Sequence, residues 1–99
     1  MARPARIIGV EHVRGFVVRL TFTDDLVREL DLEPVLVGGV LASLRDPAEF
    51  SGVFVDDVAG TIAWPNGIDL DPDVLHGDRQ PATGSSPTLV RQYTLRQTG

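Results

Sequence analysis

A period-two pattern over residues 16–23, in which every second residue is large and apolar, most constrains the fold of this 99-residue chain. Successive side chains of a strand point to opposite faces of a sheet, so the pattern predicts a half-buried strand. The positions expected to face the core are Phe16, Val18, Leu20 and Phe22. Residues 26–32 continue the alternation, and residues 6–13 are rich in β-formers. Short turn sequences separate the three segments, at Arg14-Gly15 and Thr23-Asp24-Asp25, which predicts a three-stranded antiparallel meander.

Helical signals follow the meander. Glu33-Pro34 and Gly38-Gly39 end the alternation, and residues 40–44 have helical spacing. Residues 46–49 then have the order of a capping box, with Asp46 as the N-cap and proline at the first helical position. We therefore expect a short helix and, directly after it, a further helical turn.

Two more strands complete the predicted fold, at residues 53–56 and 61–64, and form a second β-hairpin. The chain is long enough for one core, so we expect residues 1–78 to form a single α+β domain of two layers. Its parts are the meander, the short helix, the second hairpin and a terminal helical turn. Residues 79–99 contain a linker composition at 80–87 and are expected to be mostly a flexible, basic C-terminal tail. Beyond the linker, the alternative is that Leu89, Val90, Tyr93 and Leu95 dock as a strand or a helix, on a partner or on a second copy.

The terminal helical turn is specified by residues 70–77. Asp71 is a predicted N-cap and Pro72 occupies the first helical position. Leu70 and Leu75 then stand at the two positions of a hydrophobic staple, and Gly77 is suited to end the helix.

The chain reverses just before this helix. Pro65 followed by Asn66-Gly67 is a turn sequence, placed directly after the strand that ends in Trp64. Trp64 is the only tryptophan, and two interpretations stay open for it. It is either an anchor of the core, which we favour, or a partly exposed residue that contributes strongly to binding a partner.

Three alternating carboxylates, Asp69, Asp71 and Asp73, resemble the start of a calcium-binding loop. The rest of that motif is missing, because Val74 replaces its glycine and Gln80 replaces its twelfth-position acid. Helix capping is therefore the favoured role, with metal binding as the alternative.

The same region resembles a known family, the small bacterial proteins of domain-of-unknown-function family 2442 (DUF2442). The residues that carry the resemblance are Trp64-Pro65-Asn66-Gly67, Asp69-Leu70, Pro72-Asp73, Phe54-Val55-Asp56, Leu44-Arg45-Asp46 and Phe50. The similarity covers about residues 7–76, with Asp24-Asp25 where the family usually has Asp-Gly and His76 where an aromatic residue is common. It implies a strand-rich α+β fold and a neighbouring gene for another small protein, as in a toxin–antitoxin-like pair.

Charge is distributed unevenly along the chain. Residues 1–78 hold six Arg and all fourteen acids, a net charge of −8, whereas residues 79–99 hold three Arg and no acid, a net charge of +3. The acidic body repels phosphate, which disfavours nucleic-acid binding by the folded part. The longest apolar run, residues 35–44, is too short to span a bilayer, and no signal peptide is evident. We expect a cytoplasmic protein that does not enter membranes.

Catalytic chemistry has few candidates. The absence of cysteine excludes disulfides, thiolate metal sites and a cysteine nucleophile. Serine occurs without a nucleophile-elbow motif, and the two histidines are His12 and His76. We therefore expect no catalytic residue, no metal and no cofactor.

The favoured hypothesis is a non-enzymatic protein-interaction module, antitoxin-like in role, with a protein partner or a second copy of itself. Its predicted interaction residues are Trp64, Pro65, Asn66, Gly67 and Asp69, and its predicted structural caps are Asp46, Asp71 and Pro72. One alternative is a metal-binding or enzymatic domain that uses Asp69, Asp71, Asp73 and His76. The other is a DNA-binding regulator that uses the Arg-containing tail of residues 79–99.

Overall fold

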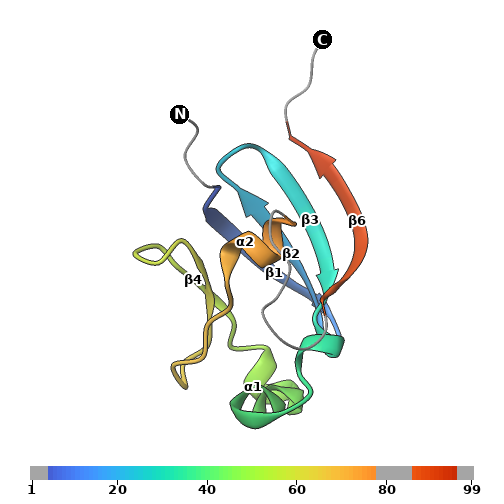
Figure 1. Ribbon diagram of the computed structural model, residues 1–99, viewed down its shortest axis with the longest axis vertical. Coiled ribbons are helices and arrows are strands. Elements are labelled where there is room, and N and C mark those ends of the chain that lie inside the picture. The colour runs from blue at the N-terminus through green and yellow to red at the C-terminus, as the bar shows by residue number, and fades with distance from the viewer. Residues whose placement is uncertain (1–4, 78–85, 96–99) are drawn as a thin grey trace.

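The computed structural model describes residues 5–77 and 86–95 and has an α+β fold with two β-sheets (Figure 1). A four-stranded antiparallel sheet has the order β1-β2-β3-β6, and β4 and β5 form a separate hairpin. The strands are β1 (Ile7–Arg14), β2 (Val17–Phe22), β3 (Leu26–Asp31), β4 (Phe54–Asp56), β5 (Thr61–Ala63) and β6 (Thr88–Thr94). The predicted meander and second hairpin are both confirmed.

The turn between β2 and β3 explains how the hairpin forms without the usual Asp-Gly. Asp25 adopts a φ of +69°, a left-handed conformation that glycine favours and that aspartate tolerates. The Asp24 carboxylate accepts a hydrogen bond from the Leu26 N–H at 3.1 Å, and the Asp25 N–H donates to the Phe22 carbonyl at 3.0 Å. The hydrogen bond to the Asp24 side chain thus stabilises a turn in which Asp25 occupies the left-handed position that glycine usually takes.

Four short helices connect the strands or follow them. They are the 3₁₀ helices η1 (Glu33–Val35) and η2 (Gly39–Arg45) and the α-helices α1 (Pro47–Phe50) and α2 (Pro72–His76). The segment expected to be a short helix at residues 40–44 is therefore present, within a slightly longer 3₁₀ helix. None of the helices in the described part of the chain has the length and apolar character needed to cross a bilayer.

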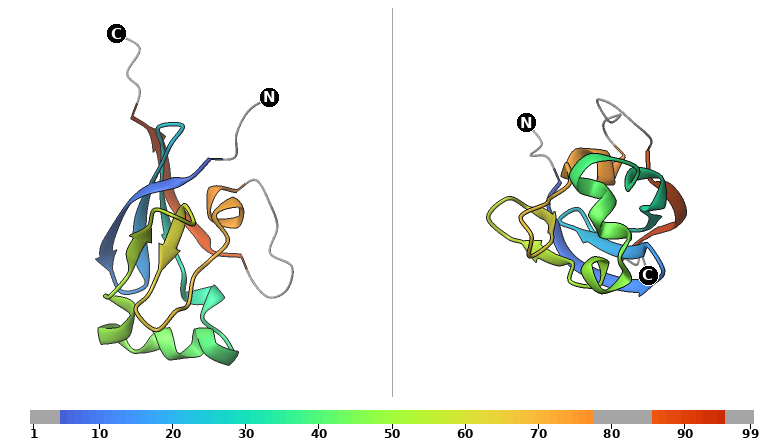
Figure 2. Two further views of the ribbon diagram at one scale, coloured as in Figure 1. Left: turned by 90° about the vertical axis from the view of Figure 1, so that its left-hand side faces the viewer. Right: turned by 90° about the horizontal axis from the view of Figure 1, so that it is seen from below.

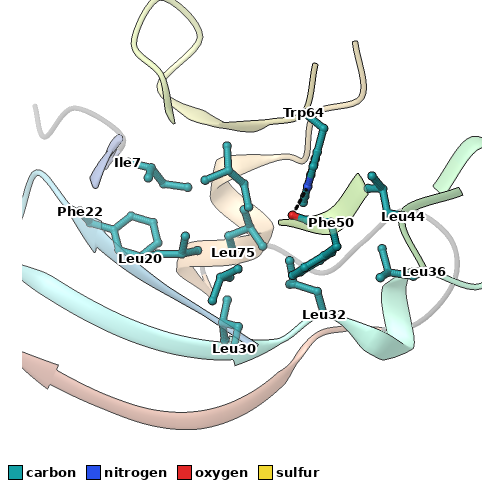
Figure 3. Close-up of a cluster of buried hydrophobic side chains, with 12 residues drawn as sticks. Ile7, Leu20, Phe22, Leu30, Leu32, Leu36, Leu44, Phe50, Trp64 and Leu75 are labelled. Atoms are coloured by element: carbon teal, nitrogen blue, oxygen red, sulfur yellow. Dashed lines mark hydrogen bonds between the residues drawn. The ribbon is translucent and has the colours of Figure 1, made fainter. Parts of the chain in front are cut away.

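The core lies between the inner face of the four-stranded sheet and the layer that contains the β4–β5 hairpin and α2, with the short helices closing one end (Figure 2). Alternation places Val18, Leu20 and Phe22 of β2 on this inner face, and all three are fully buried, as predicted. Figure 3 draws twelve buried residues of this core and labels Ile7, Leu20, Phe22, Leu30, Leu32, Leu36, Leu44, Phe50, Trp64 and Leu75.

Strand β6 corrects the expectation of a flexible tail at residues 79–99. Residues 88–94 pair antiparallel with β3, in a register that sets Tyr93 against Val27, Arg91 against Glu29 and Leu89 against Leu30. Each position on β6 thus faces a residue type that suits it, an aromatic against a β-branched residue, a cation against an acid and leucine against leucine. The partners are more than fifty residues apart in the chain, so composition alone could not reveal the pairing. Residues 78–85 and 96–99 lie outside the described residues.

The two long edges of the sheet differ. At the β1 edge, the Ile7 N–H donates to the carbonyl of Gly60 at 2.9 Å, so the β4–β5 turn lies against this edge. The Arg6 guanidinium adds hydrogen bonds to the carbonyls of Asp57 at 2.7 Å and Val58 at 3.0 Å. Strand β6 forms the opposite edge.

Candidate functional site

Trp64 lies in the core and contributes to the fold rather than to the surface. Its ring is 1% exposed, and its Nε1–H donates to the carbonyl of Phe50 at 2.9 Å (Figure 3). The ring centroids of Phe50 and Trp64 are 5.7 Å apart. The favoured interpretation of Trp64 as a core anchor is confirmed, and the expectation that it is an interaction residue is wrong, because a partner cannot reach the buried ring.

The residues after Trp64 form a tight, exposed turn. The Gly67 N–H donates to the Trp64 carbonyl at 2.9 Å, and the Asn66 side chain accepts from the Ile68 N–H at 3.1 Å. Gly67 has a φ of +91°, which requires glycine or an equally tolerant residue. The Trp64 N–H closes the turn by donating to the Ile68 carbonyl at 2.9 Å, so Pro65, Asn66 and Gly67 are exposed on a well-defined backbone.

The alternating carboxylates have different roles. Asp71 caps α2, because its carboxylate accepts from the Asp73 N–H at 2.9 Å, with Pro72 at the first helical position. Asp46 caps α1 in the same way, through the Ala48 N–H at 3.0 Å. Asp69 is exposed and belongs to the turn, where it forms an isolated bridge with Ala63. The capping roles given to Asp46, Asp71 and Pro72 are therefore observed.

The fold does not bring Asp69, Asp71, Asp73 and His76 together into a metal site. Within residues 5–77 and 86–95, no three acidic or histidine side chains are grouped so that they could hold a metal ion. His76 instead faces Asp24, with 2.8 Å between Nε2 and Oδ2, and His12 contacts the Gly15 carbonyl at 2.8 Å.

The contact between His76 and Asp24 fastens α2 to the β2–β3 turn. His76 is mostly buried and its ring packs edge-on against Phe22 at 4.8 Å between centroids. Partial desolvation opposes ionisation of Asp24, but the hydrogen bonds from His76 and from the Leu26 N–H outweigh it and lower the pKa of this carboxyl. Arg28 of β3 adds a second tie, from its Nη1 to the Leu75 carbonyl at 2.7 Å.

An open depression lies between η2 and the exposed turn. It has a volume of about 460 Å³ and is lined by Val40, Leu41, Asn66, Gly67, Ile68 and Asp69. Val40 is 72% exposed, whereas Leu41 and Ile68 are half-buried and pack against the core. The lining therefore combines apolar side chains with one amide residue and one carboxylate residue.

This depression brings together three of the predicted interaction residues, Asn66, Gly67 and Asp69. Sequence reasoning missed Val40 and Leu41, which it treated only as part of a helix. The available signal was Gly38-Gly39, which precedes them and in which Gly39 adopts a φ of +56°, a conformation that glycine favours.

The arginines of the DNA-binding alternative are only partly described. Arg91 lies on β6, with its guanidinium carbon 5.0 Å from the centroid of the Tyr93 ring. It therefore belongs to the sheet rather than to a free tail, while Arg79 and Arg96 lie outside the described residues.

Comparison with known proteins identifies one family. Residues 7–79 match the model of the family described as a protein of unknown function (DUF2442). This match covers β1 to β5 and α2, and β6 lies beyond it. Searches among curated proteins and among solved structures found no significant match. Since the family model covers well over half of the chain, the protein belongs to the DUF2442 family.

Proposed function

We propose that this protein is a non-enzymatic interaction module that binds another small protein, as the neutralising member of a toxin–antitoxin-like pair does. The observation that carries the proposal is the open depression beside η2, defined by Val40, Leu41 and residues 66–69. The contact surface would use three of the interaction residues predicted from the sequence, Asn66, Gly67 and Asp69, together with Val40.

The surface has the make-up of a small binding site for a protein segment. Val40 presents a large apolar side chain that is 72% exposed, next to half-buried Leu41 and Ile68. An apolar side chain of a partner would bury these apolar side chains and gain roughly 25 cal/mol for each Å² of apolar surface removed from water. The tight turn at residues 66–68 is already ordered by its own hydrogen bonds, which reduces the entropy lost on binding.

Charge indicates which partners fit. Asp69 lines the depression, and the first 78 residues carry a net charge of −8. A basic segment that carries an apolar side chain would be attracted over long range and oriented at the depression. The partner class is therefore a small basic protein, for which the neighbouring gene is the first candidate, and both proteins would act in the cytoplasm.

The test is co-expression with the protein encoded beside this one, followed by affinity purification and titration calorimetry. We expect a complex that forms at moderate salt and weakens as salt rises. Val40→Asp should weaken binding about tenfold or more, because it places a charge among the apolar side chains of the depression. The matched control is Val58→Asp, since Val58 is 87% exposed in the β4–β5 turn and is not part of the depression.

Two results would overturn the proposal. One is the absence of co-purification at both low and moderate salt. The other is a Val40→Asp variant that binds the partner as tightly as the Val58→Asp control.

A further inference from the structure

Strand β6 presents a long outer edge with an apolar character. Among the described residues it has a strand neighbour on one side only, β3, and all seven of its residues are exposed. Arg91 is its one charged residue. The large exposed side chains on or next to this strand are Leu89, Val90, Tyr93 and Leu95, each between 37% and 51% exposed. An edge of this kind is a template for a further strand.

The backbone groups available at this edge can be identified. The Leu95 N–H donates to the carbonyl of Asp25 at 2.8 Å, so residue 95 directs its backbone groups toward β3 and its turn. Backbone groups alternate in direction along a strand. Gln92 and Thr94 therefore direct their N–H and C=O groups outward.

A bulge limits the regular part of the edge. The pairing with β3 shifts register between Glu29, which faces Arg91, and Leu30, which faces Leu89, so Val90 is the extra residue. A partner strand can follow β6 without interruption over residues 91–95.

We propose that two copies of this chain associate through residues 91–95, which pair antiparallel about a two-fold axis at Tyr93. Gln92 of each copy then faces Thr94 of the other, and about four backbone hydrogen bonds form between the outward-directed groups. The association joins the two four-stranded sheets into one continuous sheet.

The side chains favour this register. Tyr93 of one copy stands opposite Tyr93 of the other at a non-hydrogen-bonded pair, where side chains of neighbouring strands come closest. Arg91 already lies over the Tyr93 ring of its own chain and would face Leu95 of the second copy. A two-fold axis at Tyr93 leaves the two Arg91 Cα atoms about 14 Å apart, whereas an axis at Arg91 would set two like charges directly opposite each other.

The distribution of charge supports a second copy as the occupant. Arg91 stands opposite Glu29 of β3 in the strand register, so this cation has an acidic residue beside it in its own chain. The edge carries no acid, while residues 1–78 have a net charge of −8. When two copies join through β6, their β1 strands lie at the two far edges of the joined sheet. Strand β1 of each copy is therefore distant from the other copy.

This association uses a surface separate from the depression beside η2, so it is independent of the proposed function. Val40→Asp should leave self-association unchanged, and loss of self-association should leave the depression intact.

Sedimentation velocity of the full chain over a concentration series tests the proposal. We expect a monomer–dimer equilibrium, and Thr94→Pro should weaken self-association about tenfold or more. Proline removes an outward N–H and fills the edge with its ring, yet it leaves the bonds to β3 in place. Thr94→Ala is the matched control, because it retains the N–H and should dimerise like the unaltered chain.

Cross-linking tests the register directly. The chain has no cysteine, so a single Tyr93→Cys substitution gives one thiol per copy. Diamide takes up the two hydrogen atoms as the thiols form a disulfide, and the separation at a non-hydrogen-bonded pair suits this bond. We expect rapid dimer cross-linking by Tyr93→Cys and slow cross-linking by Val58→Cys, which lies in the β4–β5 turn.

Three outcomes would overturn the proposal. They are a chain that sediments as a monomer at concentrations up to about 1 mM, a Thr94→Pro variant that dimerises like Thr94→Ala, and equal cross-linking rates for the two cysteine variants.

Discussion

Residues 64–77 and residues 86–95 both pack on the same framework of strands, but they are held there by different forces. The first segment buries Trp64 and Leu75 to 1% exposure and fastens them with hydrogen bonds from Trp64 to Phe50 and from Arg28 to Leu75. In the second segment, every residue of β6 is exposed. It is held by the backbone pairing with β3 and by a side-chain hydrogen bond from Arg28 to Gln92 at 2.9 Å.

The two segments therefore differ in how they contribute to stability and to association. Buried apolar area and satisfied polar groups make the first segment part of the cooperative core, because both are lost only on global unfolding. Exposed hydrogen bonds at an edge can open locally, so the second segment is suited to exchange with a strand of another molecule. Substitutions in the first segment should therefore lower the free energy of unfolding much more than substitutions in the second.

Removing the tryptophan ring should have the largest effect. We expect Trp64→Ala to lower the free energy of unfolding by about 3–5 kcal/mol, because it leaves a cavity and removes the hydrogen bond from the indole Nε1–H to the Phe50 carbonyl. Leu89→Ala on β6 is the control and should cost less than about 1 kcal/mol, since Leu89 is 47% exposed. Urea denaturation followed by circular dichroism measures both. Equal costs would contradict the division between the two segments.

The acidic residues of the first segment provide a smaller, matched pair. Asp71→Ala should cost about 1 kcal/mol, because it removes the cap that accepts from the Asp73 N–H. Asp69→Ala should stay within about 0.5 kcal/mol, since Asp69 is an exposed residue of the turn. Thermal unfolding of the two variants side by side tests the assignment. A larger loss from Asp69→Ala than from Asp71→Ala would show that the capping interpretation is mistaken.

How far the sequence predicts the structure also follows this division. The helix at residues 72–76 was predictable because its cap, its proline and its terminal glycine are neighbours in the chain. The turn at Asn66-Gly67 was predictable for the same reason. For β6 the sequence left a strand and a helix open and could not predict the pairing with β3, because the partners Val27, Glu29 and Leu30 lie on a distant segment.

The candidate site shows the same limit. Alternation predicted the buried face of β2, but no local signal places η2 beside the turn at residues 66–69. The depression therefore emerges only from the packing of two segments that are far apart in the chain. Burial of Trp64 is likewise a tertiary property, and the sequence left two interpretations of that residue open.

The smallest effect expected concerns pH. The pKa of Asp24 is lowered in the folded protein from its ordinary value of 3.8, so ionised Asp24 stabilises the fold above about pH 4. This contribution is lost as the pH falls through the lowered pKa of the folded state. It should not exceed about 0.5 kcal/mol, because the Asp24 side chain is 49% exposed and solvent screens the interaction.

Comparison with Asp24→Asn isolates this contribution. The variant should show a shallower loss of stability between about pH 5 and pH 2 than the unaltered chain, measured by urea denaturation at each pH. Identical pH profiles would indicate that the contact between Asp24 and His76 does not fasten α2 to the turn.

Native-state hydrogen exchange on the full chain, at a concentration low enough to keep it monomeric, tests the contrast between the two segments most directly. We expect the amide of Trp64, which is bonded to the Ile68 carbonyl, to exchange only through global unfolding. The amide of Leu95, bonded to the Asp25 carbonyl, should exchange about 100-fold faster or more through local opening of the β6 edge. Equal protection of the two amides would contradict the account, because β6 would then belong to the same cooperative unit as the core.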